Sequence, residues 1–318
     1  FDSRSMMSSN RQSTRHVHRS CPLCEQEDAR PWIEKGPLRL VRCRNCSMIY
    51  ANPVEVELAS GEFYDRRGAP YYLSPDKLAG DYAPVRFERE LRLFRVYCRG
   101  GAVLDVGCST GAFLFQLKAR FPGAYTVAGT DVTGAALDHG ESRGIEAIRG
   151  SFPEIDFGFR RFEAITFWAV LEHLVQPRTF LGRVAALLQP GGHCFILVPN
   201  LKSLATRLLG AKYRYIMPDH VNYFTEETLK RFAATERACE LVRLSQSHFN
   251  PLVILQDLRG GTARVADEAR ARLLKRTTAL KQHRLLEPAK WVYSGIERML
   301  VATGLADNLV LVLRKKFL

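Results

Sequence analysis

The stretch from Val103 to Phe113 reads VLDVGCSTGAF: a short apolar run, an acid, and a turn of small residues that opens into an apolar segment. Apolar runs of this length are typical of parallel strands, which are covered on both faces. Gly107 and Gly111 bracket the turn, and glycine lets a backbone bend tightly and approach a ligand closely. We therefore expect a strand, a glycine turn and a helix, a unit that binds nucleotide-sized ligands.

A second acid stands where such a unit needs one. The run TVAGTD ends on Asp131, 26 positions after Asp105. A carboxylate at the end of the second strand can accept hydrogen bonds from both hydroxyls of an adenosine ribose, because it offers two oxygens. Dinucleotide-binding turns follow G-x-G-x-x-G, whereas three residues separate Gly107 from Gly111 here. We expect an adenosine ligand without a pyrophosphate; a similar turn that binds nothing is the alternative.

The segment VLDVGCSTGAF resembles motif I of the class I S-adenosylmethionine-dependent methyltransferases, with Ser109 in place of the middle glycine of the usual G-x-G-x-G. Asp131 falls where that family has its ribose-binding acid. Later segments resemble the family in the same order: Phe162–Leu174, Leu187–Asn200, His220–Phe232 and Asn308–Lys316. The resemblance runs from about Tyr64 to the C-terminus. It implies an α/β fold, a Rossmann-like sheet with helices on both faces, and methyl transfer from S-adenosylmethionine.

The resemblance also implies which residues contact the cofactor. The glycine turn would surround the methionine part, Asp131 would bind the ribose, and Trp168 would border the methyl-donor end. Val132 and Phe152 would flank the adenine, and Ser151 stands where many relatives have an acid for the adenine amine. The expected cofactor contacts are Tyr82, Asp105, Gly107, Cys108, Gly111, Asp131, Val132, Ser151, Phe152 and Trp168.

An aromatic segment before the core is expected to form a lid. It holds four tyrosines followed by an arginine: Tyr64, Tyr71, Tyr72, Tyr82 and Arg86. Aromatic rings can cover a sulfonium cation and shape an acceptor pocket. Ordinary packing is the alternative for these tyrosines.

His173 and His220 are the candidate bases that would remove a proton from the acceptor. Each is expected in a loop after a strand, at the edge of the sheet where α/β folds bind ligands. His173 is the first choice, because its loop is similar to that of small-molecule O-methyltransferases that use a histidine there. The neighbouring Glu172 can orient the ring or keep it basic. In the alternative, Glu172 and His173 only begin a helix.

The same loop suggests a metal-dependent alternative. Small-RNA 2′-O-methyltransferases and some ubiquinone-pathway enzymes resemble it but carry E-x-x-E-H as metal ligands, whereas Ala169 replaces the first glutamate here. Glu172, His173 and His220 could still hold a divalent ion.

Four of the eight cysteines form C-x2-C-x18-C-x2-C: Cys21, Cys24, Cys43 and Cys46. Two C-x2-C pairs at this spacing are typical of a zinc ribbon, in which four thiolates surround one Zn²⁺. Four protein ligands leave no open coordination position, so we expect a structural zinc. Four unrelated thiols are the alternative.

The net charge of +13 is unevenly distributed. Between Arg259 and Lys290 there are nine Lys and Arg against three acids. A basic amphipathic helix is expected over 264–286, with an apolar stripe made by Ala266, Ala269, Leu273 and Leu280. It could pack on the domain, touch a membrane surface or contact nucleic acid. A second helix over Trp291–Thr303 should place four apolar residues on one face: Val292, Ile296, Met299 and Leu300.

The bulk properties predict a cytoplasmic protein, because no apolar run reaches the roughly 18 residues of a membrane span and the first residues lack a signal-peptide layout. The expected parts are a disordered leader (1–20), a zinc ribbon (21–52), a lid (53–98), a methyltransferase core (99–258 and 305–318) and a helical insertion (259–304). The expected function is methylation, most readily at oxygen, of a small molecule such as a sugar, quinone or natural-product scaffold. A zinc-ribbon RNA methyltransferase and a non-catalytic binding module are the alternatives.

Overall fold

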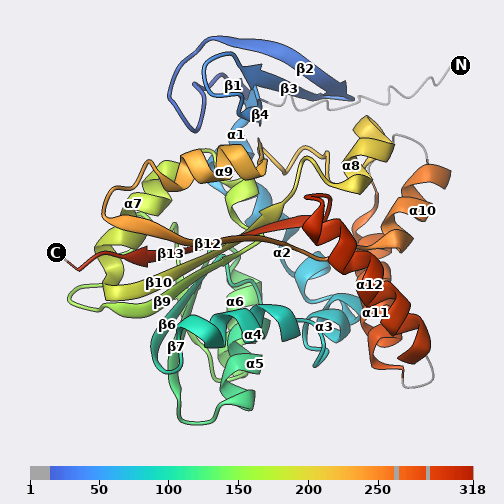
Figure 1. Cartoon of the computed structure of the whole chain (residues 1–318). Helices are drawn as coiled ribbons and strands as arrows, with labels where there is room; N and C mark the ends of the chain where they lie inside the picture. The colour runs from blue at the N-terminus through green and yellow to red at the C-terminus, as the bar shows by residue number, and fades with distance from the viewer. Residues whose placement is uncertain (1–14, 261–264, 284–286, 318) are drawn as a thin grey trace, which may run out of the picture.

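A mixed sheet of seven strands carries the fold in the computed structural model, which describes residues 15–260, 265–283 and 287–317 (Figure 1). In spatial order the strands are β12 (Cys239–Ser247), β13 (Asn308–Lys315), β10 (Leu188–Pro199), β9 (Phe162–Trp168), β6 (Gly101–Val106), β7 (Tyr125–Asp131) and β8 (Glu146–Arg149). All of them run parallel except β13, which pairs antiparallel with both β10 and β12. The α/β class and the Rossmann-like sheet are confirmed.

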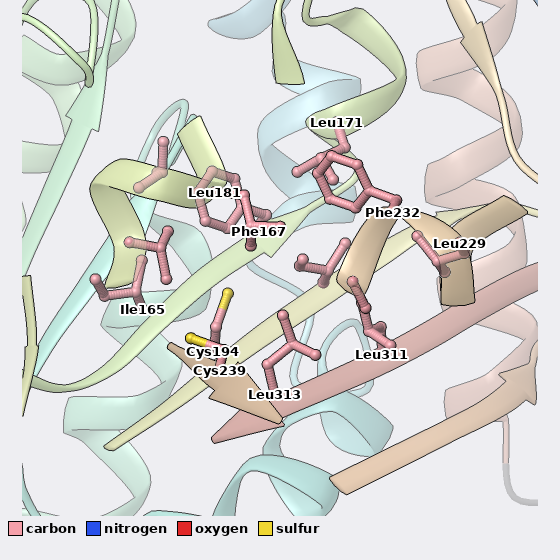
Figure 2. Packing of buried hydrophobic residues seen from close by; sticks show 14 of the residues in the cluster. Ile165, Phe167, Leu171, Leu181, Cys194, Leu229, Phe232, Cys239, Leu311 and Leu313 are labelled. Carbon is pink, nitrogen blue, oxygen red and sulfur yellow. The ribbon is translucent and has the colours of Figure 1, made fainter. Parts of the chain in front are cut away.

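Successive residues of the central strands face opposite sides of the sheet, as strand geometry requires. On β6, Val103 packs with the helices α4 (Glu88–Tyr97) and α5 (Ala112–Arg120), whereas Leu104 belongs to the cluster on the other face. The helices α7 (Pro177–Leu187) and α9 (Glu226–Ala233) cover that other face. Figure 2 shows its packing, where residues such as Ile165, Phe167, Leu181, Phe232 and Leu311 meet. The helix α6 (Gly134–Ser142) lies on the α5 side (Figure 1).

A second sheet holds the cysteine pairs, in the order β11-β4-β3-β2. Three of its strands come from the N-terminal region and one from far along the chain: β2 (Ala29–Lys35), β3 (Leu38–Cys43), β4 (Ile49–Ala51) and β11 (Asn222–Tyr223). The β4–β11 pair is antiparallel, with Tyr50 opposite Asn222. The expected zinc ribbon is therefore completed by a strand that follows His220.

The expectation of a disordered leader through Ser20 is wrong for residues 15–20. The strand β1 (His16–Val17) pairs with β5 (Val54–Glu55), and the side chain of Arg19 is held by backbone carbonyls. These hydrogen bonds order a segment whose composition is polar. The rest of the expected leader, residues 1–14, lies outside the described residues.

Between the ribbon and the main sheet, the chain forms α1 (Val56–Ser60), α2 (Glu62–Tyr72) and α3 (Pro75–Asp81). After β10 comes the short helix α8 (Leu204–Leu209). The structure also has two short 3-10 helices: η1 (Leu171–His173), between β9 and α7, and η2 (Gly210–Lys212), after α8. The C-terminal helices are α10 (Pro251–Arg259), α11 (Asp267–Gln282) and α12 (Glu287–Ala302). Within the part of the chain that the structure describes, no helix is both long and apolar enough to cross a membrane.

The buried faces of the last two helices differ from the expected ones. The helix α11 packs against α3, where a Cβ added to Gly80 would lie only 2.7 Å from Cγ of Leu274. Its buried residues are Ala271, Leu273 and Thr278, whereas Leu280 is 40% exposed. On α12, Leu300 is buried, but the rest of the expected face points to solvent: Val292, Ile296 and Met299. Contacts with neighbouring helices, which periodicity does not report, decide which face is covered.

Candidate functional site

The glycine turn after β6 needs left-handed backbone at three positions: φ is +68° at Gly107, +51° at Ser109 and +72° at Gly111. A Cβ on Gly107 would lie 2.7 Å from Cγ2 of Val170, so the loop after β9 closes directly on this turn. Ser109 is the costly position, because side chains rarely adopt positive φ. Its backbone N–H donates to Oδ2 of Asp131 at 2.8 Å, which stabilises that conformation.

Asp131 ends β7 and joins two loops. Its Oδ2 accepts the bond from Ser109, and its Oδ1 accepts one from the N–H of Thr133 at 2.9 Å. Burial raises the pKa of Asp131, and the hydrogen bonds from Thr133 and Ser109 oppose that rise. A carboxylate has about four lone-pair sites, so both oxygens retain capacity to accept ribose hydroxyls.

Asp105, at the end of β6, and Cys108, within the turn, are both buried. Asp105 accepts a 2.6 Å hydrogen bond from the hydroxyl of Thr166, and burial raises its pKa to about 7. Burial also holds the pKa of Cys108 well above its usual value. Its Sγ fills the space above Gly129, where an added Cβ would lie 2.5 Å away. Cys108 is therefore a packing thiol, and Asp105 is the group whose charge a cationic ligand would change.

Two expected aromatic contacts lie in packed clusters. The ring of Phe152 is buried, with centroids 5.8 Å from Phe180 and 5.9 Å from Phe167. The ring of Trp168 lies 5.1 Å from that of Phe113, and its indole N–H is buried with no hydrogen-bond partner among the described residues. Buried N–H groups are nearly always hydrogen-bonded, so this indole N–H favours a bound ligand that supplies an acceptor atom.

His173, in η1, and His220, just before β11, lie next to each other. Their ring centroids are 4.7 Å apart at an interplanar angle of 85°. Nδ1 of His173 lies 2.7 Å from the carbonyl oxygen of Asp219 and 2.9 Å from the hydroxyl of Tyr64. A carbonyl only accepts, so Nδ1 carries the proton and Nε2 is the nitrogen with the lone pair in the neutral ring.

Glu172 is fully enclosed beside these rings. Its side chain is 1% exposed, and its Oε2 has no hydrogen-bond partner within the described ranges. Burial raises the pKa of Glu172 to about 8, and burial likewise holds the pKa of His220 well below its usual value. Ligand atoms of Glu172, His173 and His220 all lie within 4.8 Å of one another.

The helix α2 covers both halves of this site. Its Asp65 accepts a hydrogen bond from the N–H of Gly134, and the neighbouring Gly61 packs against Val132. Tyr64, on the same helix, contacts His173. Tyr82, between α3 and α4, donates a 2.6 Å hydrogen bond to the carbonyl of Thr110 in the glycine turn. The aromatic segment therefore connects the turn to the histidines.

Comparisons with known proteins agree with this geometry. A family model described as a methyltransferase domain matches residues 85–242. The ubiquinone biosynthesis O-methyltransferase of Caulobacter vibrioides is 31% identical over 194 residues, which cover 56% of this chain and 76% of that protein. The chain belongs to the class I S-adenosylmethionine-dependent methyltransferases. S-Adenosylmethionine is therefore the cofactor of this methyltransferase.

Two further similarities complete the comparison. The ubiquinone biosynthesis O-methyltransferase of Coxiella burnetii (strain RSA 331 / Henzerling II) is 28% identical to this chain over 192 residues. The match covers 55% of this chain and 80% of the Coxiella protein. Among solved structures, the N-methyltransferase NodS from Bradyrhizobium japonicum WM9, in complex with S-adenosyl-L-homocysteine, is 17% identical. That match covers 79% of this chain and 97% of NodS, with a TM-score of 0.45.

The four cysteines of the methyltransferase's N-terminal sheet form one cluster. All four Sγ atoms lie within 4.8 Å of one another, with Cys21 3.4 Å from Cys46 and Cys24 3.5 Å from Cys43. Tetrahedral coordination with Zn–S bonds of about 2.3 Å requires S···S separations of about 3.8 Å. The donor set therefore fits Zn²⁺ in both chemistry and spacing.

Each C-x2-C pair turns in the same way. The N–H of Glu25 bonds the carbonyl of Cys21 at 2.9 Å, and the N–H of Ser47 bonds that of Cys43 at 3.1 Å. Glu25 and Ser47, each directly after the second cysteine of its pair, have φ of +62° and +64°. This repeated turn aims both sulfurs of a pair at one point.

The residues that join these parts carry no recognisable pattern in the sequence. Arg19 links β4 to the loops that carry the histidines, and Asn222 bonds both ends of η1. Asp219 supplies the carbonyl that fixes His173. Hydrogen bonds to backbone carbonyls leave no signal in a sequence. An arginine in a polar segment such as that around Arg19 cannot be told apart from a solvent-exposed arginine by sequence alone.

Proposed function

We propose that this methyltransferase methylates a hydroxyl group of a small-molecule acceptor, with His173 as the base. The hydrogen bond between Nδ1 of His173 and Asp219 carries the proposal, because it leaves Nε2 as the proton acceptor. The two relatives matched by sequence are O-methyltransferases of ubiquinone biosynthesis, which supports a phenolic or quinol-type acceptor.

S-Adenosylmethionine supplies the methyl group for an in-line displacement by the acceptor oxygen. His173 takes the hydroxyl proton at Nε2, so the attacking oxygen becomes more nucleophilic. The Nδ1–H then faces the Asp219 carbonyl and the Tyr64 hydroxyl, which stabilise the charged ring. Burial raises the pKa of Glu172 to about 8, which favours its neutral form near pH 7.

For the cofactor, we propose that Asp131 binds the ribose and that the turn from Gly107 to Gly111 lies against the methionine part. The two open lone-pair sites on Asp131 and the unpartnered indole N–H of Trp168 support this placement. Val132 and Ser151, at the ends of β7 and β8, would border the adenine, with the packed ring of Phe152 behind them.

For the cysteine cluster, we propose one structural Zn²⁺ held by Cys21, Cys24, Cys43 and Cys46. The matching Sγ spacing and the two equivalent turns support it. Four thiolates fill a tetrahedral ion, so this metal would stabilise the ribbon rather than take part in methyl transfer.

The buried cluster of Glu172, His173 and His220 favours a second role, as three ligands to a divalent cation. The two roles give different results in a brief EDTA treatment, in which elemental analysis checks that the cysteine-bound zinc is retained. A base needs no ion, so turnover should persist in EDTA. Loss of turnover that Mg²⁺ or Mn²⁺ restores would favour the metal site.

The test of the proposed function is transfer of labelled methyl to a panel of small phenols, quinols and sugars, and to purified rRNA and tRNA. We expect transfer to a hydroxylated small molecule, and His173→Gln should reduce it by about 10² to 10⁴-fold while leaving cofactor affinity nearly unchanged. Full turnover in His173→Gln would contradict the base assignment. RNA methylation at ordinary enzymatic rates would overturn the small-molecule acceptor.

A further inference from the structure

Arg19 lies between the cysteine-bearing sheet and the main domain, and its guanidinium reaches three separate segments. Nε donates to the carbonyl of Ala51 at 3.1 Å, and Nη1 donates to that of Val175 at 2.9 Å. Nη2 donates to the carbonyl of Val221 and, at 2.9 Å, to Oδ1 of Asn222. The guanidinium also lies over the ring of Tyr50, 5.2 Å from its centroid.

Two of the three accepting segments adjoin the histidines in the chain, and the third is β4 of the N-terminal sheet. Ala51 ends β4, directly after the second cysteine pair. Val175 follows η1, which carries Glu172 and His173, and Val221 follows His220. One side chain therefore holds the N-terminal sheet and both histidine loops at fixed distances from one another.

Asn222 extends this connection to the other side of η1. While its Oδ1 accepts from Arg19, its Nδ2 donates to the carbonyls of Leu171 at 2.9 Å and Leu174 at 2.6 Å. The N–H of Val221 adds a 2.7 Å bond to the carbonyl of Glu172. Hydrogen bonds from the side chains of Arg19 and Asn222 to backbone carbonyls thus fix the relative position of the two histidine loops.

Only arginine has the donors for this arrangement. A guanidinium presents five N–H groups in a rigid plane, whereas an ammonium presents three from a single atom. Lysine at position 19 would keep the charge but could not reach three carbonyls and an amide that lie in different directions. A substitution by lysine therefore separates the geometry from the charge.

We propose that Arg19 is a positioning residue for the methyl-transfer site: through Val175, Val221 and Asn222 it holds His173 and His220 in the arrangement that removes the acceptor proton. This inference rests on the proposed function. It assigns a role in the reaction to a residue that lies outside the methyltransferase core and before the first cysteine.

The experiment uses the full chain and compares Arg19→Lys with Arg30→Lys, an exposed arginine of β2. The primary readout is the pair of ring ¹H–¹³C signals of His173 and His220 at fixed pH, assigned with His173→Gln and His220→Gln. We expect both signals to move in Arg19→Lys and to stay in place in Arg30→Lys. Zinc content and S-adenosylmethionine affinity should remain within twofold of wild type in both variants, and kcat should fall at least tenfold in Arg19→Lys with little change in KM for the cofactor.

Asn222→Asp, on β11, provides a second variant that leaves Arg19 and the four cysteines unchanged. It keeps the oxygen that accepts from Arg19 but removes the amide that donates to Leu171 and Leu174, so the His173 signal should move here too. Unchanged histidine signals in both variants would overturn the inference. Loss of zinc together with cofactor binding in both would assign Arg19 a purely structural role and also overturn it. Full turnover in His173→Gln, with the ring signals still displaced in Arg19→Lys, would refute the base assignment separately.

Discussion

Asp131 connects the turn after β6 with the loop after β7 through its two carboxylate oxygens. Its replacement by alanine should weaken S-adenosylmethionine binding by a hundredfold or more, because charge-assisted hydrogen bonds to two ribose hydroxyls contribute about 1.5 to 3 kcal/mol each. Calorimetric titration measures the change. Asp138→Ala is the matched control, since Asp138 is an exposed acid of α6 that pairs only with exposed Arg149 in the described structure. Equal affinity in Asp131→Ala and wild type would refute the ribose assignment.

Asp105 should make the cofactor-free protein less stable as pH rises. Its pKa is about 7 when folded, above the ordinary value near 3.9 of an unfolded chain. The folded state therefore binds more protons between these values, and the free energy of unfolding falls as pH rises from about 4 to 7. Asn at this position keeps the acceptor for Thr166 and removes the titration.

We therefore expect Asp105→Asn to be more stable than wild type at pH 8, by about 1 to 4 kcal/mol, and to differ less at pH 5. Urea unfolding at both pH values measures the difference. A constant difference across the two pH values would show that Asp105 does not titrate in this range.

At this scale the sequence predicts residues whose chemistry is written in their type and spacing. Gly107, Gly111 and Asp131 occupy the predicted turn and strand end, and the two histidines meet. Arg19 and Asn222 could not be predicted, because their partners are mostly backbone carbonyls brought together only by the complete fold.

Among the elements, α9 depends on a hydrogen-bonded N-terminus directly after β11. The hydroxyl of Thr225 accepts from the N–H of Thr228 at 3.2 Å, and the hydroxyl of Thr228 accepts from the N–H of Thr225 at 2.9 Å. Thr225→Ala should lower the free energy of unfolding by about 1 kcal/mol. Both threonines are buried, so water cannot replace the lost capping hydrogen bond. Thr225→Ser should restore most of it in the same urea titration. A serine variant as unstable as the alanine one would place the effect in the methyl group's packing.

The order and type of the main elements follow from hydrophobic periodicity and turn residues, because each central strand is an apolar run between a glycine turn and a helix. The covered face of a helix is harder to predict. Met299 and Leu300 belong to one apolar stripe of α12, yet one is 58% and the other 3% exposed. The stripe is wider than the surface against which it packs.

In the whole molecule, the cysteine cluster belongs to the main hydrophobic core rather than to a separate module. Cys21, Cys43 and Cys46 pack in one cluster with Phe224 and Leu229 of the methyltransferase core. Removal of the metal by a strong chelator, or Cys43→Ser, should therefore increase amide hydrogen exchange in β2–β4 and also in β11.

Elemental analysis should find one zinc per chain before chelation. S-Adenosylmethionine affinity should change little, because the proposed cofactor residues belong to β6 and β7. Ser142→Ala, at an exposed position of α6, serves as the control for the cysteine substitution. Metal-free protein with wild-type exchange throughout β2–β4 would show that the thiols need no ion.

The strand β13 lies between β10 and β12, although both of its neighbours precede it in the chain. A ribosome that releases residues in order must therefore present β10 and β12 with open hydrogen-bonding edges until residue 315 has emerged. Open edges beside apolar strands are sites at which nascent chains associate wrongly. The nascent chain is therefore prone to aggregation throughout the translation of α10, α11 and α12. A premature stop within those helices would give a truncated chain that lacks β13, and chaperones would bind it or proteases would degrade it.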